Sequence, residues 1–346
     1  MQSIYDLNMK MATDMLAEKG QKSYRAKQLF QWLYRKRVGS FQEMTDMPAN
    51  LLEQLAQEYS IEPVKEITRQ VARDGTTKYL FQLADGSSVE TVLMHFHFGE
   101  SLCVTSQLGC NMGCTFCASG LLKKQRDLTA GEIVGQVMFV QKELDKIGKR
   151  VDNVVIMGTG EPFDNYDNVM RFCEIINSDL GLAIGARHIT ISTCGIVPRI
   201  KEFAKGHYQY NLAISLHAPN DALRRRLMPI DQVYPLDVLM DALHEYSEDN
   251  NRRITFEYIL LHGVNDTDAH AIELANLIRG MNAYVNLIPY NQVDENGYVS
   301  TNEKVALHFY DVLMKHGVKA TLRSKHGDDI DAACGQLRAK HEKGKL

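Results

Sequence analysis

Hydrophobic residues recur along the chain at two spacings, one typical of helices and one typical of strands. Up to about residue 60 they fall on helical faces, with Leu29 and Leu33 on one face and Leu51 and Leu55 on a second. The positions between them are polar and often basic, as at Arg35. This pattern predicts a small helical region at the amino terminus.

A hairpin signal follows this helical region. The runs Thr77–Leu83 and Ser88–Met94 are rich in β-branched and aromatic residues, and they flank Asp85-Gly86. Because Asp-Gly favours the tight turn that joins two antiparallel strands, the segment predicts a β-hairpin.

From Ser101 onward, short β-branched runs alternate with segments of helical period, which predicts parallel strands with helices outside them. The first turn of one helix is marked by a capping box of Thr129 and Glu132. Six or seven such units predict an α/β fold of the partial or full barrel type, with its chemistry at the carboxyl ends of the strands. The expected strands are Leu102–Thr105, Val154–Met157, His188–Ser192, Leu212–Leu216, Ile254–Leu260, Tyr284–Ile288 and Val318–Leu322.

These patterns divide the chain into three parts. We expect a helical accessory domain over residues 1–75, a hairpin and connecting segment over 76–100, and the α/β core over 101–340. Internal repeats and low-complexity linkers are not found in the sequence.

Composition narrows the function classes. The 39 Lys and Arg residues against 43 Asp and Glu give a net charge of −4, so any contact with RNA must come from local basic patches. Apolar runs of the length needed to span a bilayer, about 20 residues, do not occur, and the amino terminus has no secretory pattern, which predicts a cytoplasmic protein without a membrane partner. Seven cysteines, an odd number, favour metal binding or catalysis over a disulfide framework.

Cys110, Cys114 and Cys117 form a C-x3-C-x2-C motif shortly after the first predicted core strand. Three thiolates on one tight loop can hold three irons of a [4Fe-4S] cluster and leave the fourth iron open to a ligand. A structural zinc site would need four ligands. Phe116, directly before the third cysteine, can shield the cluster. A zinc knuckle or buried thiols are the alternatives.

Several strand ends carry small polar groups that suit a ligand pocket. Gly160 and Glu161 follow a buried strand, where glycine allows close approach of the backbone and a carboxylate can accept a hydrogen bond from an amino group. The other strand ends present Ser192, Ser215, Leu216, His217 and Asn291. Taken alone, a serine there is usually a turn former, and a lone histidine is more often structural.

Three further residues have two interpretations each. Cys334 stands between small residues and before Gly335, which predicts a mobile loop that exposes the thiol, although a buried cysteine is the ordinary alternative. Cys103 lies in a strand, where core packing is the ordinary interpretation. Glu90, in the second hairpin strand, is a strand carboxylate that can be exposed.

The cysteine motif, with an aromatic residue before its last cysteine, resembles the radical S-adenosylmethionine superfamily. Within it, the phrases S-L-H-A-P-N at 215–220 and D-I-D-A-A-C-G-Q-L at 329–337 resemble the RNA adenine-carbon-2 methyltransferase family. The resemblance extends from about Ser23 to Lys340. Two positions depart from the pattern, because Thr159 replaces a methionine or isoleucine and Cys194 replaces a serine.

The resemblance implies a partial (β/α)6 barrel that uses a [4Fe-4S] cluster and two molecules of S-adenosylmethionine. In this family the residue matching Cys334 is methylated, and an adenosyl radical then takes a hydrogen atom from its methyl group so that the carbon adds to the base. Cys103 would resolve the adduct by forming a disulfide with Cys334, and Glu90 would accept the ring proton. The implied S-adenosylmethionine site contains Gly160, Glu161, Ser192, Ser215, Leu216, His217 and Asn291.

The implied partners are 23S ribosomal RNA, free or in an assembling subunit, and transfer RNA, with the 1–75 domain as an RNA-binding accessory. A flavodoxin-type reductase would supply electrons, and we expect a monomer. A carbon-8 methyltransferase of antibiotic resistance and a non-catalytic zinc RNA-binding protein are the alternatives, although Pro162 and the Gly327–Asp329 phrase favour carbon 2. Candidate phosphate contacts are Arg25, Lys27, Lys36, Arg37, Lys123, Lys124, Arg126, Arg224, Arg225, Arg226, Arg338, Lys340 and Lys343.

Overall fold

A computed structural model of the chain describes residues 1–121, 123–292, 296–323, 330, 337, 338 and 341. Cys334, Lys340 and Lys343 lie outside these residues. No helix within the described part of the chain is long and apolar enough to cross a bilayer.

The amino-terminal region is helical, as predicted, and its leucines form a buried core with Leu16, Leu29 and Leu51 almost inaccessible to solvent. At its base, Asp6 accepts a hydrogen bond from the backbone N–H of Gly131 at 2.6 Å, which anchors the region to the first long helix of the core. The elements are β1 (Gln2–Ser3), η1 (Ile4–Asp6), α1 (Met9–Glu18), α2 (Tyr24–Phe30), η2 (Gln31–Lys36), η3 (Phe41–Glu43), α3 (Ala49–Glu58) and β2 (Tyr59–Ser60).

The core is one ten-stranded sheet in the order β14-β13-β12-β11-β10-β9-β6-β5-β4-β3. Its strands from β14 to β6 are parallel and those from β6 to β3 are antiparallel. This arrangement confirms the predicted strands and hairpin and the partial-barrel fold class. The bounds are β3 (Val64–Val71), β4 (Thr77–Leu83), β5 (Ser88–Phe96), β6 (Gly99–Cys103), β9 (Val151–Ile156), β10 (Ile189–Thr193), β11 (Asn211–Ser215), β12 (Ile254–Leu260), β13 (Ala283–Pro289) and β14 (Ala320–Leu322).

Two features of the sheet go beyond the sequence prediction. The hairpin also belongs to the core sheet, because β5 pairs with β6. An additional strand, β3, pairs with β4. It went unpredicted because it is an edge strand whose accessible positions include Lys65 and Arg69, so it lacks the continuous apolar run of the central strands.

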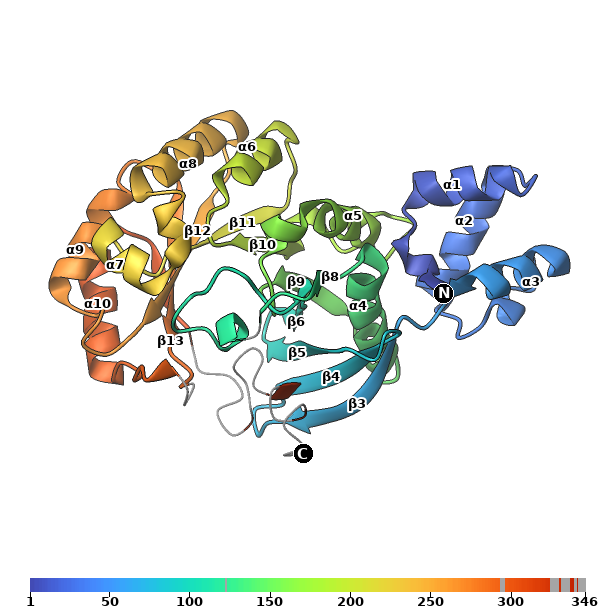
Figure 1. Cartoon of the computed structure of the whole chain (residues 1–346), viewed down its shortest axis with the longest axis horizontal. Coiled ribbons are helices and arrows are strands. Elements are labelled where there is room, and N and C mark those ends of the chain that lie inside the picture. Colours follow the sequence, from blue (N-terminus) through green and yellow to red (C-terminus); the bar gives the residue numbers. More distant parts are fainter. Residues whose placement is uncertain (122, 293–295, 324–329, 331–336, 339–340, 342–346) are drawn as a thin grey trace.

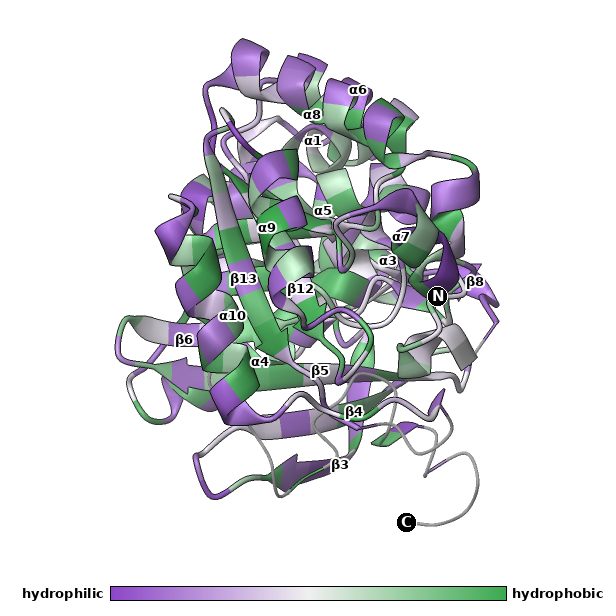
Figure 2. Cartoon of the chain, turned by 90° about the vertical axis from the view of Figure 1, so that its left-hand side faces the viewer, coloured by the Kyte–Doolittle hydropathy of each residue, from purple (hydrophilic) through white to green (hydrophobic). Residues whose placement is uncertain are grey.

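The helices cover one face of this curved sheet, and the amino-terminal region lies at the opposite end of the molecule from α8, α9 and α10 (Figure 1). Figure 2 shows hydrophobic colour along β13, whereas α6 and α8 carry much hydrophilic colour. The α-helices of the core are α4 (Ala130–Asp145), α5 (Tyr166–Asn177), α6 (Val197–Lys205), α7 (Asp221–Leu227), α8 (Leu236–Asn250), α9 (Asp268–Leu277) and α10 (Glu303–Lys315). Short helical turns are η4 (Ala118–Leu121), η5 (Pro162–Asn165), η6 (Ala186–His188) and η7 (Pro229–Gln232).

The face of the sheet away from the helices is lined by polar side chains. Phe81 contacts Phe139 of α4 with ring centroids 4.8 Å apart, and Tyr258 stacks on Phe309 of α10 at 5.4 Å, so these rings mark the helix-covered face. Because successive side chains in a strand alternate between faces, the residues next to these rings lie on the opposite, inner face. Strand registers then place on the inner face Lys78, Glu90, Cys103, Ser192, Ser215, Glu257 and Asn286.

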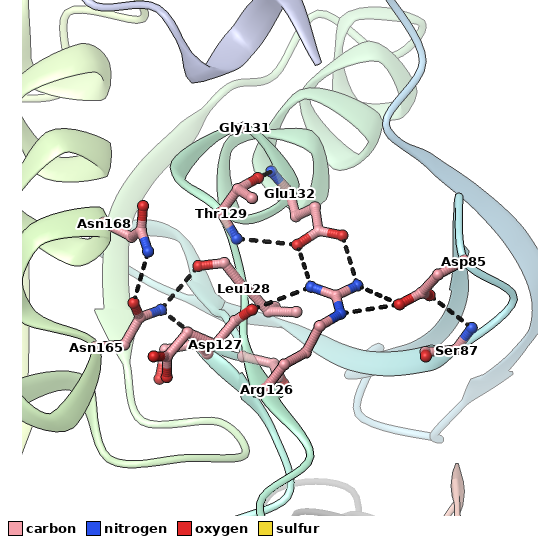
Figure 3. Close-up of polar contacts among 12 residues, drawn as sticks. Asp85, Ser87, Arg126, Asp127, Leu128, Thr129, Gly131, Glu132, Asn165 and Asn168 are labelled. Atoms are coloured by element: carbon pink, nitrogen blue, oxygen red, sulfur yellow. Dashed lines mark hydrogen bonds and ion pairs between the residues drawn. The ribbon is translucent and has the colours of Figure 1, made fainter. Parts of the chain in front are cut away.

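The short strands β7 (Gln107–Leu108) and β8 (Arg126–Asp127) pair antiparallel and close the loop that carries the cysteine motif. Beside them the predicted capping box of Thr129 and Glu132 forms at the start of α4. The Glu132 carboxylate also binds the Arg126 guanidinium through two contacts of 2.8 Å, and Arg126 reaches Asp85 in the hairpin turn (Figure 3). This network fixes the hairpin and the cysteine loop to one helix end.

Candidate active site at the carboxyl ends of the strands

Cys110, Cys114 and Cys117 lie on the loop between β7 and β8, and all three are half-buried. The backbone N–H of Thr115 donates to the carbonyl of Leu227 at 2.9 Å, which fixes the loop to the end of α7. Gly120 packs so closely that a Cβ atom there would lie 2.9 Å from the Cys114 carbonyl oxygen. The loop is therefore tightly folded around its three thiols.

The three thiols oppose one another's ionisation. Burial raises the pKa of Cys110 to about 11, and the neighbouring Cys117 adds to this shift. Burial also raises the pKa of Cys114 well above its usual value, with Cys117 and Cys110 adding to it. Cationic iron would offset this repulsion, and in a cubane cluster each thiolate has its own iron, so the donor set fits a [4Fe-4S] cluster. In the described residues, no three His, Cys, Asp or Glu side chains are placed to share one metal ion.

Phe116 connects the cysteine loop to the strand ends. Its buried ring meets the ring of His217 edge-on with centroids 4.9 Å apart, and its carbonyl accepts a hydrogen bond from the Tyr290 hydroxyl at 3.3 Å. Phe116, the residue next to the third cysteine, Cys117, therefore joins the segments that follow β11 and β13 to the cysteine loop.

The glycines of the turn after β9 allow this turn to pack closely against the segment that follows β6. A Cβ atom on Gly158 would lie 2.7 Å from the Val104 carbonyl oxygen, and one on Gly160 would lie 2.6 Å from the Gln107 side chain. Gly160 also has a φ of +109°, a conformation that L side chains rarely adopt. The structure thus gives these glycines a packing role against the neighbouring chain segment, and the predicted close approach of a ligand to Gly160 stays a prediction.

Glu161 is a buried carboxylate held by backbone donors. Its Oε2 accepts from the N–H of Cys194 at 2.8 Å, and its Oε1 accepts from the N–H of Phe163 at 3.0 Å. Burial raises the pKa of this carboxyl group, and the hydrogen bonds oppose the shift. Each carboxylate oxygen has a further lone pair, so Glu161 can still accept a hydrogen bond from an amino group.

The other predicted pocket residues gather at neighbouring strand ends. The hydroxyl oxygens of Ser192 and Ser215 are 3.3 Å apart, and Leu216 is fully buried. His217 has a φ of 58°, and its Nδ1 accepts from the N–H of Ile259 at 3.1 Å. Burial, together with the charge of Arg224, lowers the pKa of His217 to about 3, so the ring is neutral. Asn291 lies two residues beyond β13 and is half-buried.

Glu90 is buried, which corrects the interpretation of an exposed strand carboxylate. Its Oε2 lies 2.9 Å from the Nζ of Lys78, a side chain with 0% exposure. Its Oε1 accepts from the backbone N–H of Arg338 at 2.7 Å, so Arg338 lies against this part of the sheet. Cys103, on the same face at the end of β6, is half-buried, and burial raises its thiol pKa to about 11.

Comparison with known proteins identifies relatives of this site and fold. The family model of the radical SAM superfamily matches residues 104–275, and the model of the ribosomal RNA large subunit methyltransferase N-terminal domain matches residues 2–61. A protein of Enterococcus faecalis named "Probable dual-specificity RNA methyltransferase RlmN" is 55% identical over 347 residues, which cover 99% of this chain and 97% of that protein. The chain belongs to this RNA methyltransferase family.

Further comparisons agree with this assignment to the radical S-adenosylmethionine RNA methyltransferases. A relative of the same name from Listeria welshimeri is 56% identical over 346 residues, covering 99% of this chain and 94% of that protein. A crystal structure described as a radical SAM methyltransferase from Sphaerobacter thermophilus superposes with a TM-score of 0.93 at 42% identity, covering 97% of this chain and 99% of that one.

Several basic residues predicted to bind phosphate in this methyltransferase have other roles. Arg224 has 0% exposure and pairs with Asp231 at 3.3 Å and with the carbonyl of Cys194 at 2.6 Å. Arg126 binds Asp85 and Glu132 (Figure 3), and Arg338 is buried. The predictions for Arg224 and Arg338 are wrong, because both residues are buried, whereas a phosphate contact by the partly exposed Arg126 stays a prediction. The exposed candidates among the described residues are Lys27, Lys36, Lys123, Arg225 and Arg226.

Sequence reasoning missed two buried charged residues of the inner face, Lys78 and Glu257. Each is the lone charged residue in a short β-rich run, T-K-Y-L-F for Lys78 and I-T-F-E-Y-I-L for Glu257. A charge in such a run is the signal that could have found them, since ionisable side chains are rarely buried without a partner or a function.

Proposed function

We propose that this methyltransferase methylates carbon 2 of an adenine in 23S ribosomal RNA, and in transfer RNA, with Cys334 as the carrier of the methyl group. One observation supports it most directly. The backbone N–H of Arg338, four residues after Cys334, donates to Glu90 at 2.7 Å, on the same sheet face as Cys103. Arg338 therefore contacts Glu90, one of the two other residues to which the proposal gives a chemical role, and the second, Cys103, lies on the same sheet face.

Cys110, Cys114 and Cys117 would hold the [4Fe-4S] cluster, which when bound supplies the electron that cleaves S-adenosylmethionine. Glu161 would accept a hydrogen bond from the amino group of the methionine moiety. The remaining contacts of the cosubstrate site would come from Gly160, Ser192, Ser215, Leu216, His217 and Asn291. Neutral His217 suits this site, because an imidazolium would repel the sulfonium group.

The thiols would act in turn. The Cys334 thiolate displaces the methyl group of a first S-adenosylmethionine, releasing S-adenosylhomocysteine. The 5′-deoxyadenosyl radical from a second S-adenosylmethionine would take a hydrogen atom from this S-methyl group and become 5′-deoxyadenosine. The methylene carbon would then bond to the ring, and the adduct radical would return one electron to the oxidised cluster. Cys103 then attacks the Cys334 sulfur as a thiolate, forming the disulfide and breaking the carbon–sulfur bond. The released carbon takes up a proton and becomes the methyl group.

Glu90 would accept the proton that leaves the ring carbon. Lys78 forms an ion pair with Glu90 that is shielded from solvent, and this pair holds the Glu90 carboxyl group on the inner face. The disulfide must be reduced before the next turnover, and a flavodoxin-type reductase would supply the electron for cleavage. We expect a cytoplasmic monomer.

The test is turnover under anaerobic conditions with reconstituted enzyme, S-adenosylmethionine, reductant, and unmodified 23S RNA or transfer RNA. Mass spectrometry of the RNA nucleosides should find 2-methyladenosine, and the Cys334→Ala variant should give none. 8-Methyladenosine would instead assign the enzyme to the carbon-8 reaction. Zinc in place of iron after reconstitution would contradict the enzyme proposal.

The Cys103→Ala variant tests the resolving step separately. Without the attacking thiol, the RNA should stay covalently bound to Cys334, and the variant should be isolated with RNA. The double variant lacking both Cys103 and Cys334 is the control, because it has no sulfur to carry the adduct. Recovery of Cys103→Ala without RNA would contradict the two-cysteine route.

A further inference from the structure

Glu257 is a buried carboxyl group on the inner face to which the proposed reaction gives no role. It lies in β12 and is 3% exposed. Its Oε1 accepts a hydrogen bond from the Asn286 amide at 3.2 Å, whereas its buried Oε2 has no hydrogen-bond partner in the described structure. An unpaired buried carboxyl oxygen is costly, and such groups in native proteins call for an explanation. A bound molecule that supplies the missing partner would provide one.

The surroundings of Glu257 place it next to the predicted cosubstrate site. Ser215 of β11 lies directly opposite Glu257 in the strand register, and its hydroxyl oxygen is 3.3 Å from that of Ser192. Two residues further along β12, the N–H of Ile259 donates to His217, whose ring contacts the cysteine loop. Because a strand rises about 3.3 Å per residue, Glu257 lies roughly 7 Å along β12 from Ile259. A ligand that begins at the cysteine loop can therefore extend to Glu257.

The chemistry of Glu257 favours a hydroxyl group as its partner. Burial raises the pKa of Glu257, and the charge of Arg323 opposes that shift. A hydroxyl group can donate to a carboxylate or accept from a carboxylic acid, so it suits Glu257 in either form, whereas an ammonium or an exocyclic amine only donates. Carboxylates bind ribose hydroxyls in this way in dinucleotide-binding folds.

We propose that Glu257 binds a ribose hydroxyl group of the molecule that reacts at this site. The inference rests on the proposed function, in which both S-adenosylmethionine and the target nucleotide bring a ribose to the inner face. It adds a specificity determinant to that site, because Glu257 would distinguish ribose from deoxyribose. The two sources of ribose are separated by experiment.

The test measures binding by the anaerobically reconstituted full-length enzyme. In the first arm, the affinity for S-adenosylmethionine is compared with that for its 2′-deoxy and 3′-deoxy analogues. In the second arm, an RNA fragment is compared with one that carries 2′-deoxyadenosine at the target position. In one of the two arms, we expect the unaltered enzyme to bind the deoxy ligand about tenfold more weakly than its hydroxylated counterpart. This is the effect of losing one hydrogen bond to a buried carboxyl group.

In the Glu257→Ala variant this discrimination should fall below about twofold, while affinity for the hydroxylated ligand falls about tenfold. Glu257→Gln, which keeps the shape and one acceptor, should lie between the two. Glu100→Gln is the matched control. Glu100 is also a buried carboxylate, but it lies at the amino-terminal end of β6, away from the predicted site, and it pairs with Lys149 at 2.6 Å. Iron content and thermal unfolding confirm that each variant is folded and loaded.

The arm in which discrimination is lost identifies the source of the ribose, the cosubstrate or the target nucleotide. Discrimination that survives in Glu257→Ala and Glu257→Gln in both arms would overturn the assignment of Glu257 and leave the proposed function intact. An unaltered, iron-loaded enzyme that binds no S-adenosylmethionine would instead contradict the proposed function.

Discussion

Lys78 and Glu90 form an ion pair inside the protein, and replacing Lys78 with methionine should leave a carboxylate buried without its cation. Both side chains are almost fully buried, 0% and 4% exposed, and their charged atoms are 2.9 Å apart. Removing one partner of a buried pair costs about 3–5 kcal/mol. Because the Arg338 N–H still binds Glu90 at 2.7 Å, we expect the lower end, about 3 kcal/mol.

The assay is urea unfolding of Lys78→Met, Glu90→Gln and the double variant, with the unaltered protein as reference. Methionine has a similar length and fills the space of the lysine stem, so the experiment removes mainly the charge. In a double-mutant cycle, the double variant should be less destabilised than the sum of the two single variants, by at least about 1 kcal/mol. A catalytic consequence should follow, because Lys78 holds the Glu90 carboxyl group in position, and without this pair the RNA adduct should be released more slowly.

Two results would refute this reasoning. Unfolding of Lys78→Met at the same urea concentration as the unaltered protein would show that the pair contributes nothing to stability. Strict additivity of the two substitutions would show that Lys78 and Glu90 do not interact energetically. Arg69→Met serves as the comparison, because Arg69 pairs with Glu143 at 3.3 Å near the surface and should cost less than about 1 kcal/mol.

Three further predictions follow from local geometry. Gly160→Ala should destabilise the protein by more than Gly86→Ala in thermal unfolding, because both glycines have positive φ values, 109° and 87°, but only at Gly160 would the new side chain collide with a neighbour. His217→Gln should lose less stability on acidification than the unaltered protein, because the folded-state pKa of His217, about 3, lies below the usual 6.5. The stability that neutral His217 contributes is therefore complete above pH 6.5 and is lost as pH falls toward 3. Urea unfolding measured across this pH range tests it, and the same dependence of the unfolding free energy on pH in both proteins would contradict it. Thr129→Ala should cost about 1 kcal/mol by removing the capping contact with Glu132, and no change in unfolding free energy would contradict the role of the cap.

The fold could be predicted from sequence where one local signal sufficed. Central strands such as Ile254–Leu260 are buried on both faces and appear as β-rich runs, and the Asp85-Gly86 turn marks the hairpin by its backbone preference. The edge strand β3 has no such signal, because its stability comes from pairing with β4 and all of its residues after Val64 are exposed or half-buried.

The sequence predicted which residues gather at the site better than it predicted how deeply each of them is buried. The cysteine spacing and the strand-end polar residues locate the site, since parallel strands bring their carboxyl ends to one edge. The burial of Glu90 depends on Arg338, almost 250 residues away along the chain, and no local pattern encodes that contact. Arg224 is buried for a similar reason, because Asp231 and the Cys194 carbonyl compensate its charge only in the folded chain.

Turnover with S-adenosylmethionine that carries a trideuterated methyl group tests the central claim most directly. If a methylated cysteine delivers the carbon after one hydrogen atom has been removed from it, the product methyl group on the RNA should hold two deuterium atoms, and the third should appear in 5′-deoxyadenosine. A product methyl group that keeps all three deuterium atoms would contradict the account, because it would show direct transfer of an intact methyl group.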